Sequence, residues 1–165
     1  MAVTFHNAET KNSLPLAGGR LPPKPLRGAV RLLESMGHGT LIEFPLKSGR
    51  RADILSLGPQ GEIWIVEVKS GVPDFRSDHK WQDYLEWCDR FFFAVGPDFP
   101  AAILPPHAGL LIADDYDAVL VSEPETMRLA ASRRKALTLR FAHIAARRLS
   151  GRGDPAIVGA GEQIG

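Results

Sequence analysis

Residues 50–70 hold two apolar runs separated by a short turn, and this stretch limits the fold more than any other part of the chain. Gly58, Pro59 and Gly61 are residue types that turns favour. The runs on either side are rich in Ile, Leu, Val and Trp, which are common in strands. The pattern therefore predicts a β-hairpin that closes about Gln60.

Three charged residues interrupt these apolar runs, namely Asp53, Glu67 and Lys69. Glu67 and Lys69 are two positions apart, so they share one face of the second strand. If the hairpin closes symmetrically about Gln60, Asp53 stands opposite Glu67. We therefore expect two carboxylates and one ammonium group to converge at the end of the hairpin farthest from the turn.

Two facing carboxylates repel each other unless a cation neutralises them. Hard cations such as Mg²⁺ take oxygen ligands and often use only one or two protein carboxylates. The pattern therefore predicts a Mg²⁺ or Mn²⁺ site at Asp53 and Glu67, with Lys69 beside it. The alternative is a surface cluster in which Lys69 is the only counter-ion.

The order and spacing of these residues resemble the PD-(D/E)xK nuclease superfamily, which has a restriction-endonuclease-like core. Three segments are more specifically similar to the MmcB-type bacterial DNA repair proteins. They are Gly-Arg-Arg-Ala-Asp at 49–53, Ile-Trp-Ile-Val-Glu-Val-Lys-Ser at 63–70 and Asp-His-Lys-Trp at 78–81. The resemblance covers about residues 22–148, and it departs from the superfamily pattern at Ala52, which replaces a proline.

This resemblance implies an α/β fold with an αβββαβ core, in which a mixed β-sheet is flanked by helices. It implies that Asp53, Glu67 and Lys69 are catalytic. The metal ligands would be Asp53, Glu67 and the backbone carbonyl of Val68. Glu34 is a further candidate ligand by position, because many members of the superfamily carry an acidic residue in the first helix.

The rest of the sequence predicts one domain over residues 22–149, with flexible tails at 1–21 and 150–165. Apolar spacing and chain breakers predict helices at 24–36 and 125–149 and strands at 40–44, 90–96, 109–114 and 118–121. Residues 71–77 are expected to be a loop, and residues 97–106 a loop with one helical turn. Glu43 faces either the site or solvent.

Two helices are expected to bury apolar stripes. Ser77 or Asp78 can cap the helix that follows the loop. The buried residues of that helix are predicted to be Trp81, Tyr84, Leu85 and Cys88. Those of the last helix are predicted to be Ala130, Leu137, Phe141 and Ile144.

The net charge is only +1, but basic residues are concentrated near the C-terminus. Residues 125–149 contain seven Lys or Arg and one Glu, which gives this segment a charge of +6. Arg133, Arg140 and Arg147 are seven positions apart and could follow a phosphate backbone. Arg50, Arg51 and Lys80 are further candidate DNA contacts near the predicted site. For each group, a solvated surface is the alternative.

One cysteine, Cys88, and the lack of a signal-like or membrane-spanning run predict a cytoplasmic protein with a packed, unreactive thiol. The sequence thus favours a DNA repair protein that is a Mg²⁺- or Mn²⁺-dependent DNA nuclease. The alternative is a catalytically silent DNA-binding module of the same fold that recruits repair partners. A homodimer is compatible with either hypothesis.

Overall fold

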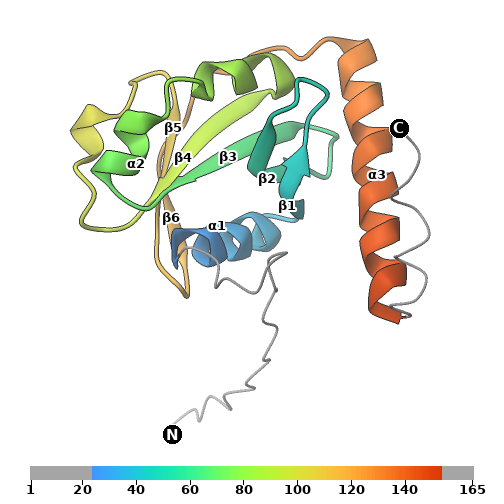
Figure 1. Cartoon of the computed structure of the whole chain (residues 1–165), viewed down its shortest axis with the longest axis horizontal. Helices are drawn as coiled ribbons and strands as arrows, with labels where there is room; N and C mark the ends of the chain where they lie inside the picture. Colours follow the sequence, from blue (N-terminus) through green and yellow to red (C-terminus); the bar gives the residue numbers. More distant parts are fainter. Residues whose placement is uncertain (1–23, 154–165) are drawn as a thin grey trace, which may run out of the picture.

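The computed structural model describes residues 24–153, which fold around one six-stranded mixed sheet (Figure 1). The strands lie side by side in chain order: β1 (Gly39–Pro45), β2 (Arg51–Leu57), β3 (Ile63–Lys69), β4 (Arg90–Val95), β5 (Gly109–Ala113) and β6 (Ala118–Ser122). β1 to β3 are antiparallel neighbours, β3 to β5 run parallel, and β6 returns antiparallel. The predicted mixed sheet between helices is confirmed.

The β2–β3 hairpin has the register that symmetry about Gln60 predicts. Leu55 pairs with Ile65, and Leu57 pairs with Ile63. The regular ladder of this pair extends to Ile54 and Val66. Asp53 and Glu67, the next residues along, therefore lie where the two strands begin to separate.

One face of the sheet is covered by α1 (Lys24–Ser35), which confirms the predicted first helix. Leu26, Val30 and Leu33 pack there against residues of β3 that include Trp64 and Val66. Gly28 allows α1 to approach the β5–β6 turn, because a Cβ atom at this position would lie 2.1 Å from the Asp117 carbonyl oxygen. This contact fixes the start of α1 near the carboxyl end of β5.

The other face is covered by α2 (Val72–Ser77), the 3₁₀ helix η1 (Trp81–Trp87) and α3 (Ala131–Gly153). The predicted loop at 71–77 is therefore wrong, because Pro73 at the start of α2 favours a helical turn there. The predicted α-helix after it is a 3₁₀ helix. Neither Ser77 nor Asp78 caps η1, which begins after Lys80. Trp81, Tyr84 and Cys88 are buried as predicted, and Leu85 is half-buried.

The last helix begins at Ala131, six residues later than predicted, and continues to Gly153 rather than ending at Leu149. The preceding segment is extended because neighbouring groups bind its backbone: the Glu125 and Met127 N–H groups donate to the carbonyls of His107 and Asp89. Leu137 is buried, and Phe141 and Ile144 are half-buried, as predicted. Ala130 is exposed and lies before the helix, so the prediction that it is a buried residue of this helix is wrong.

The loop between β4 and β5 contains the predicted helical turn, η2 (Ala101–Ile103). Among the helices in residues 24–153, none combines the length and the apolar character that crossing a bilayer requires. The predicted tail at 1–21 and residues 154–165 of the predicted tail at 150–165 lie outside the described residues, whereas residues 150–153 belong to α3.

Candidate active site

Two side chain–backbone hydrogen bonds hold Asp53 of β2 beside Glu67 and Val68 of β3. The Asp53 N–H donates to Glu67 Oε1 at 3.1 Å, and the Val68 N–H donates to Asp53 Oδ2 at 2.8 Å. These side chains replace main-chain partners where the regular ladder ends. The two carboxylates are therefore fixed beside each other, as the hairpin pattern predicts.

Both carboxylates lie in a poorly solvated environment. Glu67 is only 5 % exposed and Asp53 is half-buried. Burial, followed by the negative charge of Asp53, raises the pKa of Glu67 to about 8. Burial also raises the pKa of Asp53 above its ordinary value, against the opposing effect of its hydrogen bond from Val68. The positively charged groups of the described residues are therefore not sufficient to keep both carboxyl groups at their ordinary pKa values.

Lys69 is buried next to this pair and is held by Asp78. Its Nζ atom lies 2.6 Å from Asp78 Oδ2 and 4.0 Å from Glu67 Oε2. Burial opposes ionisation of Asp78, but the hydrogen bonds from Lys69 and from the Lys80 N–H hold its pKa below the ordinary value. The ammonium group is therefore directed towards the junction between α2 and η1.

Asp78 and Tyr84 are site residues whose roles the sequence did not predict. The sequence offers Asp78 as a helix cap, and the resemblance favours a role for its segment, residues 78–81, without defining that role. Tyr84 was assigned to the core, and its hydroxyl donates to the Arg51 carbonyl at 3.0 Å. Burial and the nearby charges of Glu67 and Asp53 raise the pKa of Tyr84, so this hydroxyl stays protonated and anchors the start of β2.

The residues at the site fit a hard divalent cation. One oxygen of each carboxylate accepts a backbone N–H, and within residues 24–153 no hydrogen bond reaches the other oxygen of Asp53 or Glu67. No group of three or more His, Cys, Asp or Glu side chains in this part of the chain could hold a metal ion. A cation here would therefore need other oxygens, such as the Val68 carbonyl, water or a substrate phosphate, as Mg²⁺ commonly does.

Glu34 does not belong to this group. It is exposed on α1, which covers the opposite face of the sheet, and it accepts a hydrogen bond from Thr40 at 3.3 Å. Thr40 pairs with Ser56, towards the turn end of the hairpin rather than the end that carries Asp53. The structure therefore does not bring Glu34, the candidate ligand of the first helix, to the carboxylate pair.

Glu43 stands beside Asp53 in the register of β1 and β2. Its neighbours pair regularly, Ile42 with Ile54 and Phe44 with Ala52, but Glu43 has a φ angle of 50° and interrupts the ladder. This left-handed backbone is uncommon for a residue other than glycine. The Glu43 carboxylate lies 3.6 Å from the Arg51 guanidinium, so it faces the basic rim of the site.

The six candidate DNA contacts do not form one surface row. Arg50 binds Asp83 through two hydrogen bonds, at 3.0 and 2.8 Å. The Arg51 side chain is 66 % exposed, and Lys80 is also exposed. Both lie close in sequence to residues that border the carboxylate pair, so they remain suitable for contact with a substrate.

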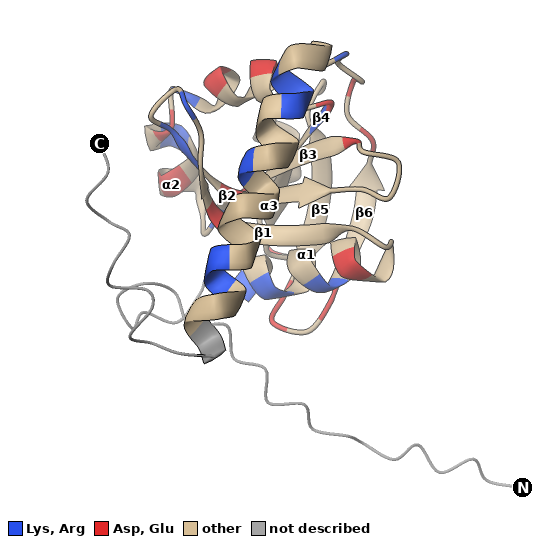
Figure 2. Cartoon of the chain, turned by 90° about the vertical axis from the view of Figure 1, so that its right-hand side faces the viewer, with Lys and Arg blue, Asp and Glu red and all other residues tan. Residues whose placement is uncertain are grey.

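The arginines of α3 differ in their surroundings, although basic residues recur along this helix (Figure 2). Arg133 binds Glu86 and lies 4.6 Å above the Trp87 ring. Arg140 donates to the Pro45 carbonyl at 2.8 Å. Arg147 is exposed. Two members of the predicted phosphate-binding row are therefore used in contacts within the protein.

Comparisons with known proteins agree with this fold. The chain is similar to a protein of unknown function from Silicibacter pomeroyi, with 48 % sequence identity and a TM-score of 0.81 over 87 % of this chain and 99 % of that one. No curated protein matched at the significance level required. A family described as DNA repair protein MmcB-like matches residues 12–156, which is most of the chain. The chain therefore belongs to the MmcB-like family of DNA repair proteins.

Proposed function

We propose that this DNA repair protein is a Mg²⁺- or Mn²⁺-dependent nuclease that hydrolyses DNA phosphodiester bonds. The observation that carries the proposal is the placement of Asp53 and Glu67 side by side, with the buried Lys69 ammonium 4.0 Å from Glu67. Membership of a DNA repair family supports DNA as the substrate. The carboxylate oxygens that accept no hydrogen bond and the raised pKa of Glu67 support a cation at this position.

Asp53, Glu67 and the Val68 carbonyl would hold the cation. When bound, Mg²⁺ or Mn²⁺ supplies Lewis-acid polarisation of the phosphodiester and lowers the pKa of a water molecule that can act as nucleophile. Lys69 is positioned to orient that water or to stabilise negative charge that develops on the phosphoryl oxygens. The water oxygen would form a bond to phosphorus and give up a proton while one ester P–O bond breaks, and a proton taken up by the leaving oxygen would yield a hydroxyl group beside the phosphate monoester.

The basic residues at the edge of the site would bind the DNA backbone. Arg51 and Lys80 are exposed. Arg50, which precedes Arg51, is oriented by its hydrogen bonds to Asp83. Cations in such positions attract phosphate without reading sequence. These contacts support a substrate that is recognised through its backbone.

The proposal is tested by cleavage of labelled single-stranded, duplex, flap and branched DNA in Mn²⁺, Mg²⁺ or EDTA. Asp53→Asn and Glu67→Gln are the sharpest variants, because each amide keeps an oxygen that can accept the same backbone N–H. We expect both to lose metal-dependent cleavage, and Lys69→Met to lose about 10²- to 10³-fold in kcat. Glu125→Gln, an exposed acidic residue outside the site, is the control.

The variants should remain folded, because burial disfavours the ionised form of both carboxyl groups and each amide is neutral. We expect the melting temperatures of Asp53→Asn and Glu67→Gln without metal to equal or exceed that of the natural chain. Cleavage that survives in both variants would contradict the assigned site. Salt-sensitive DNA binding without any cleavage by the natural chain would instead support the non-catalytic recruitment module.

A further inference from the structure

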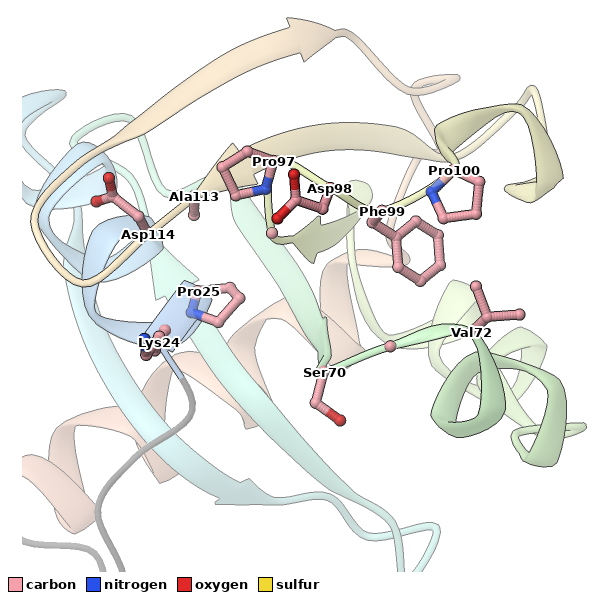
Figure 3. A pocket seen from close by; sticks show the side chains of 12 residues that line it. Lys24, Pro25, Ser70, Val72, Pro97, Asp98, Phe99, Pro100, Ala113 and Asp114 are labelled. Carbon is pink, nitrogen blue, oxygen red and sulfur yellow. The ribbon is translucent and has the colours of Figure 1, made fainter.

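A second concave site lies at the carboxyl ends of the three parallel strands (Figure 3). The cavity has a volume of about 500 Å³, within the range of pockets that hold small organic groups. Ser70, Gly96 and Ala113 line it at the ends of β3, β4 and β5. Open α/β sheets commonly bind ligands at this edge. Ser70 directly follows Lys69, so the cavity lies at the same edge of the sheet as the end of β3 that carries Lys69.

The walls of this cavity are mainly apolar and include one aromatic ring. Figure 3 shows Phe99 and Val72 on one side and Pro25 on the other, with Pro97 between them along the rim. Phe99 is half-buried and is supported by the edge of Phe75, with ring centroids 6.2 Å apart. An apolar wall with a supported aromatic face suits a planar ring better than it suits a bare phosphate.

The polar groups of the cavity also favour a neutral ring with hydrogen-bond donors. Ser70 uses its hydroxyl and its N–H to bind Asp74, and Asp114 accepts from backbone N–H groups of its own turn. Within residues 24–153, no hydrogen bond or ion pair involves the Asp98 carboxylate, which is exposed in the cavity. Adenine, cytosine and guanine carry amino groups whose N–H can donate a hydrogen bond to a carboxylate.

The charged side chains of this site favour the base of a nucleotide inside the cavity and its phosphate outside. Asp98 and Asp114 repel phosphate from the cavity, whereas Lys24 at its edge attracts phosphate. A nucleotide can satisfy both preferences if its base enters the cavity and its phosphate stays at the edge. A base in a continuous duplex is paired and stacked, so only an unpaired or extruded nucleotide can bind in this way.

We infer that this cavity binds the base of one unpaired nucleotide of the DNA strand, next to the position of cleavage. The base packs on Phe99 and donates to Asp98, and the phosphate lies near Lys24. The inference rests on the proposed function, because it concerns the same substrate. It assigns a preference for single-stranded or locally unpaired DNA to the MmcB-like chain.

Gly96→Phe tests this inference by filling the cavity. A Cβ atom at Gly96 would have no heavy-atom neighbour within 4 Å, so the ring can be introduced without a clash at its base. Gln60→Phe is the matched control, because it places the same ring at an exposed position in the hairpin turn, at the other end of β3. Both changes are made in full-length Glu67→Gln protein in EDTA, so that binding is measured without cleavage.

The readouts are the anisotropy and the fluorescence of DNA that carries one 2-aminopurine, either in a single strand or in a perfect duplex. We expect Gly96→Phe to weaken single-strand binding by roughly 10-fold, as expected for the loss of one base–aromatic stack, and to leave duplex binding unchanged. Phe99→Leu should reduce the change in 2-aminopurine fluorescence on binding. Gln60→Phe should alter neither readout.

The inference is overturned if Gly96→Phe binds single strands as tightly as its parent does, or weakens single-strand and duplex binding equally. The binding readout separates it from the proposed nuclease activity. If the natural chain does not cleave DNA but Gly96→Phe selectively weakens single-strand binding, the chemistry is contradicted and the pocket is supported. If cleavage is confirmed but this variant has no selective effect, only the pocket is contradicted.

Discussion

Lys69 depends on one short contact for its position. Its Nζ atom lies 2.6 Å from Asp78 Oδ2, and Glu67 Oε2 is 4.0 Å away. The ammonium group is buried, so it cannot exchange Asp78 for bulk water without moving. Asp78 is thus a positioning residue: it acts on the proposed chemistry through the orientation of Lys69.

We predict that Asp78→Asn lowers kcat by about 10- to 100-fold while KM changes little, the range seen when outer-shell partners of a metal site are removed. The physical reason is that Lys69 loses its nearest negative charge and shifts towards the Glu67 carboxylate, which the cation needs. Steady-state cleavage of the preferred DNA substrate measures this effect, and thermal melting serves as the folding control. An unchanged kcat would exclude the positioning role.

The sequence predicts the positions of Asp53, Glu67 and Lys69 because strand alternation and an odd-numbered turn determine which residues share a face. Glu34 was assigned by position alone, and helix periodicity does not say which face of the sheet a helix covers. Asp78 and Tyr84 reach the site through the crossover between β3 and β4. Contacts made by an irregular crossover have no comparable sequence period.

At the level of secondary-structure elements, α3 serves as a cover for an edge strand. Arg140 donates to the Pro45 carbonyl at 2.8 Å, and Arg148 donates to the Ile42 carbonyl at 2.7 Å. Both acceptors belong to β1, which lies at one end of the sheet order. Exposed strand edges favour unwanted pairing, so these arginines protect β1 as well as stabilising the position of the helix.

Substitution of Arg51 should therefore affect DNA binding, whereas substitution of Arg140 should affect the stability of the fold. We predict that Arg51→Gln weakens DNA binding and reduces the slope of log K against log salt concentration by about 1, because one phosphate contact is lost. Arg140→Gln should leave this slope unchanged and lower the free energy of unfolding by about 1.5 kcal/mol, since it removes a charge-assisted hydrogen bond to Pro45. Anisotropy titrations at several salt concentrations and urea unfolding distinguish them; the reverse pattern would contradict both assignments.

The strands of this fold could be predicted more accurately than its covering helices. Their apolar alternation and turn residues are local signals, and the hairpin register follows from them. The start of α3 depends instead on distant partners: the Met127 and Leu129 N–H groups bind the main chain and the side chain of Asp89, which keeps this segment extended. No local pattern in residues 125–130 contains that information.

Across the whole molecule, Asp89 connects three separate parts of the chain. It is 8 % exposed, and its carboxylate accepts from the Ile63 N–H in β3 at 2.8 Å and from the Leu129 N–H before α3 at 3.3 Å. Arg134 of α3 binds both carboxylate oxygens, at 2.7 and 2.6 Å. Asp89 therefore links the strand that carries Glu67 and Lys69 to the helix that covers that face of the sheet.

The pKa of Asp89 shows how this link should depend on pH. Burial opposes ionisation, but the hydrogen bonds from Arg134, Ile63 and Leu129 outweigh it and hold the pKa below the ordinary value of 3.8. Because the folded-state pKa is lower than the unfolded-state pKa, the ionised carboxylate stabilises the fold. This stabilisation is fully present above about pH 4 and is lost as the pH falls through the folded-state pKa.

We predict that Asp89→Asn lowers the free energy of unfolding by about 2–3 kcal/mol at pH 7, because the amide cannot neutralise Arg134 and directs an N–H₂ group towards donors. The difference between the variant and the natural chain should be the same at pH 7 and pH 5 and should decrease below pH 4. Urea unfolding at each pH measures it, with Asp83→Asn as the control because Asp83 binds Arg50 on the surface. A difference that grows as the pH falls would contradict the stabilising role of the ionised carboxylate. A difference near zero at pH 7 would show that Asp89 does not hold β3 and α3 together.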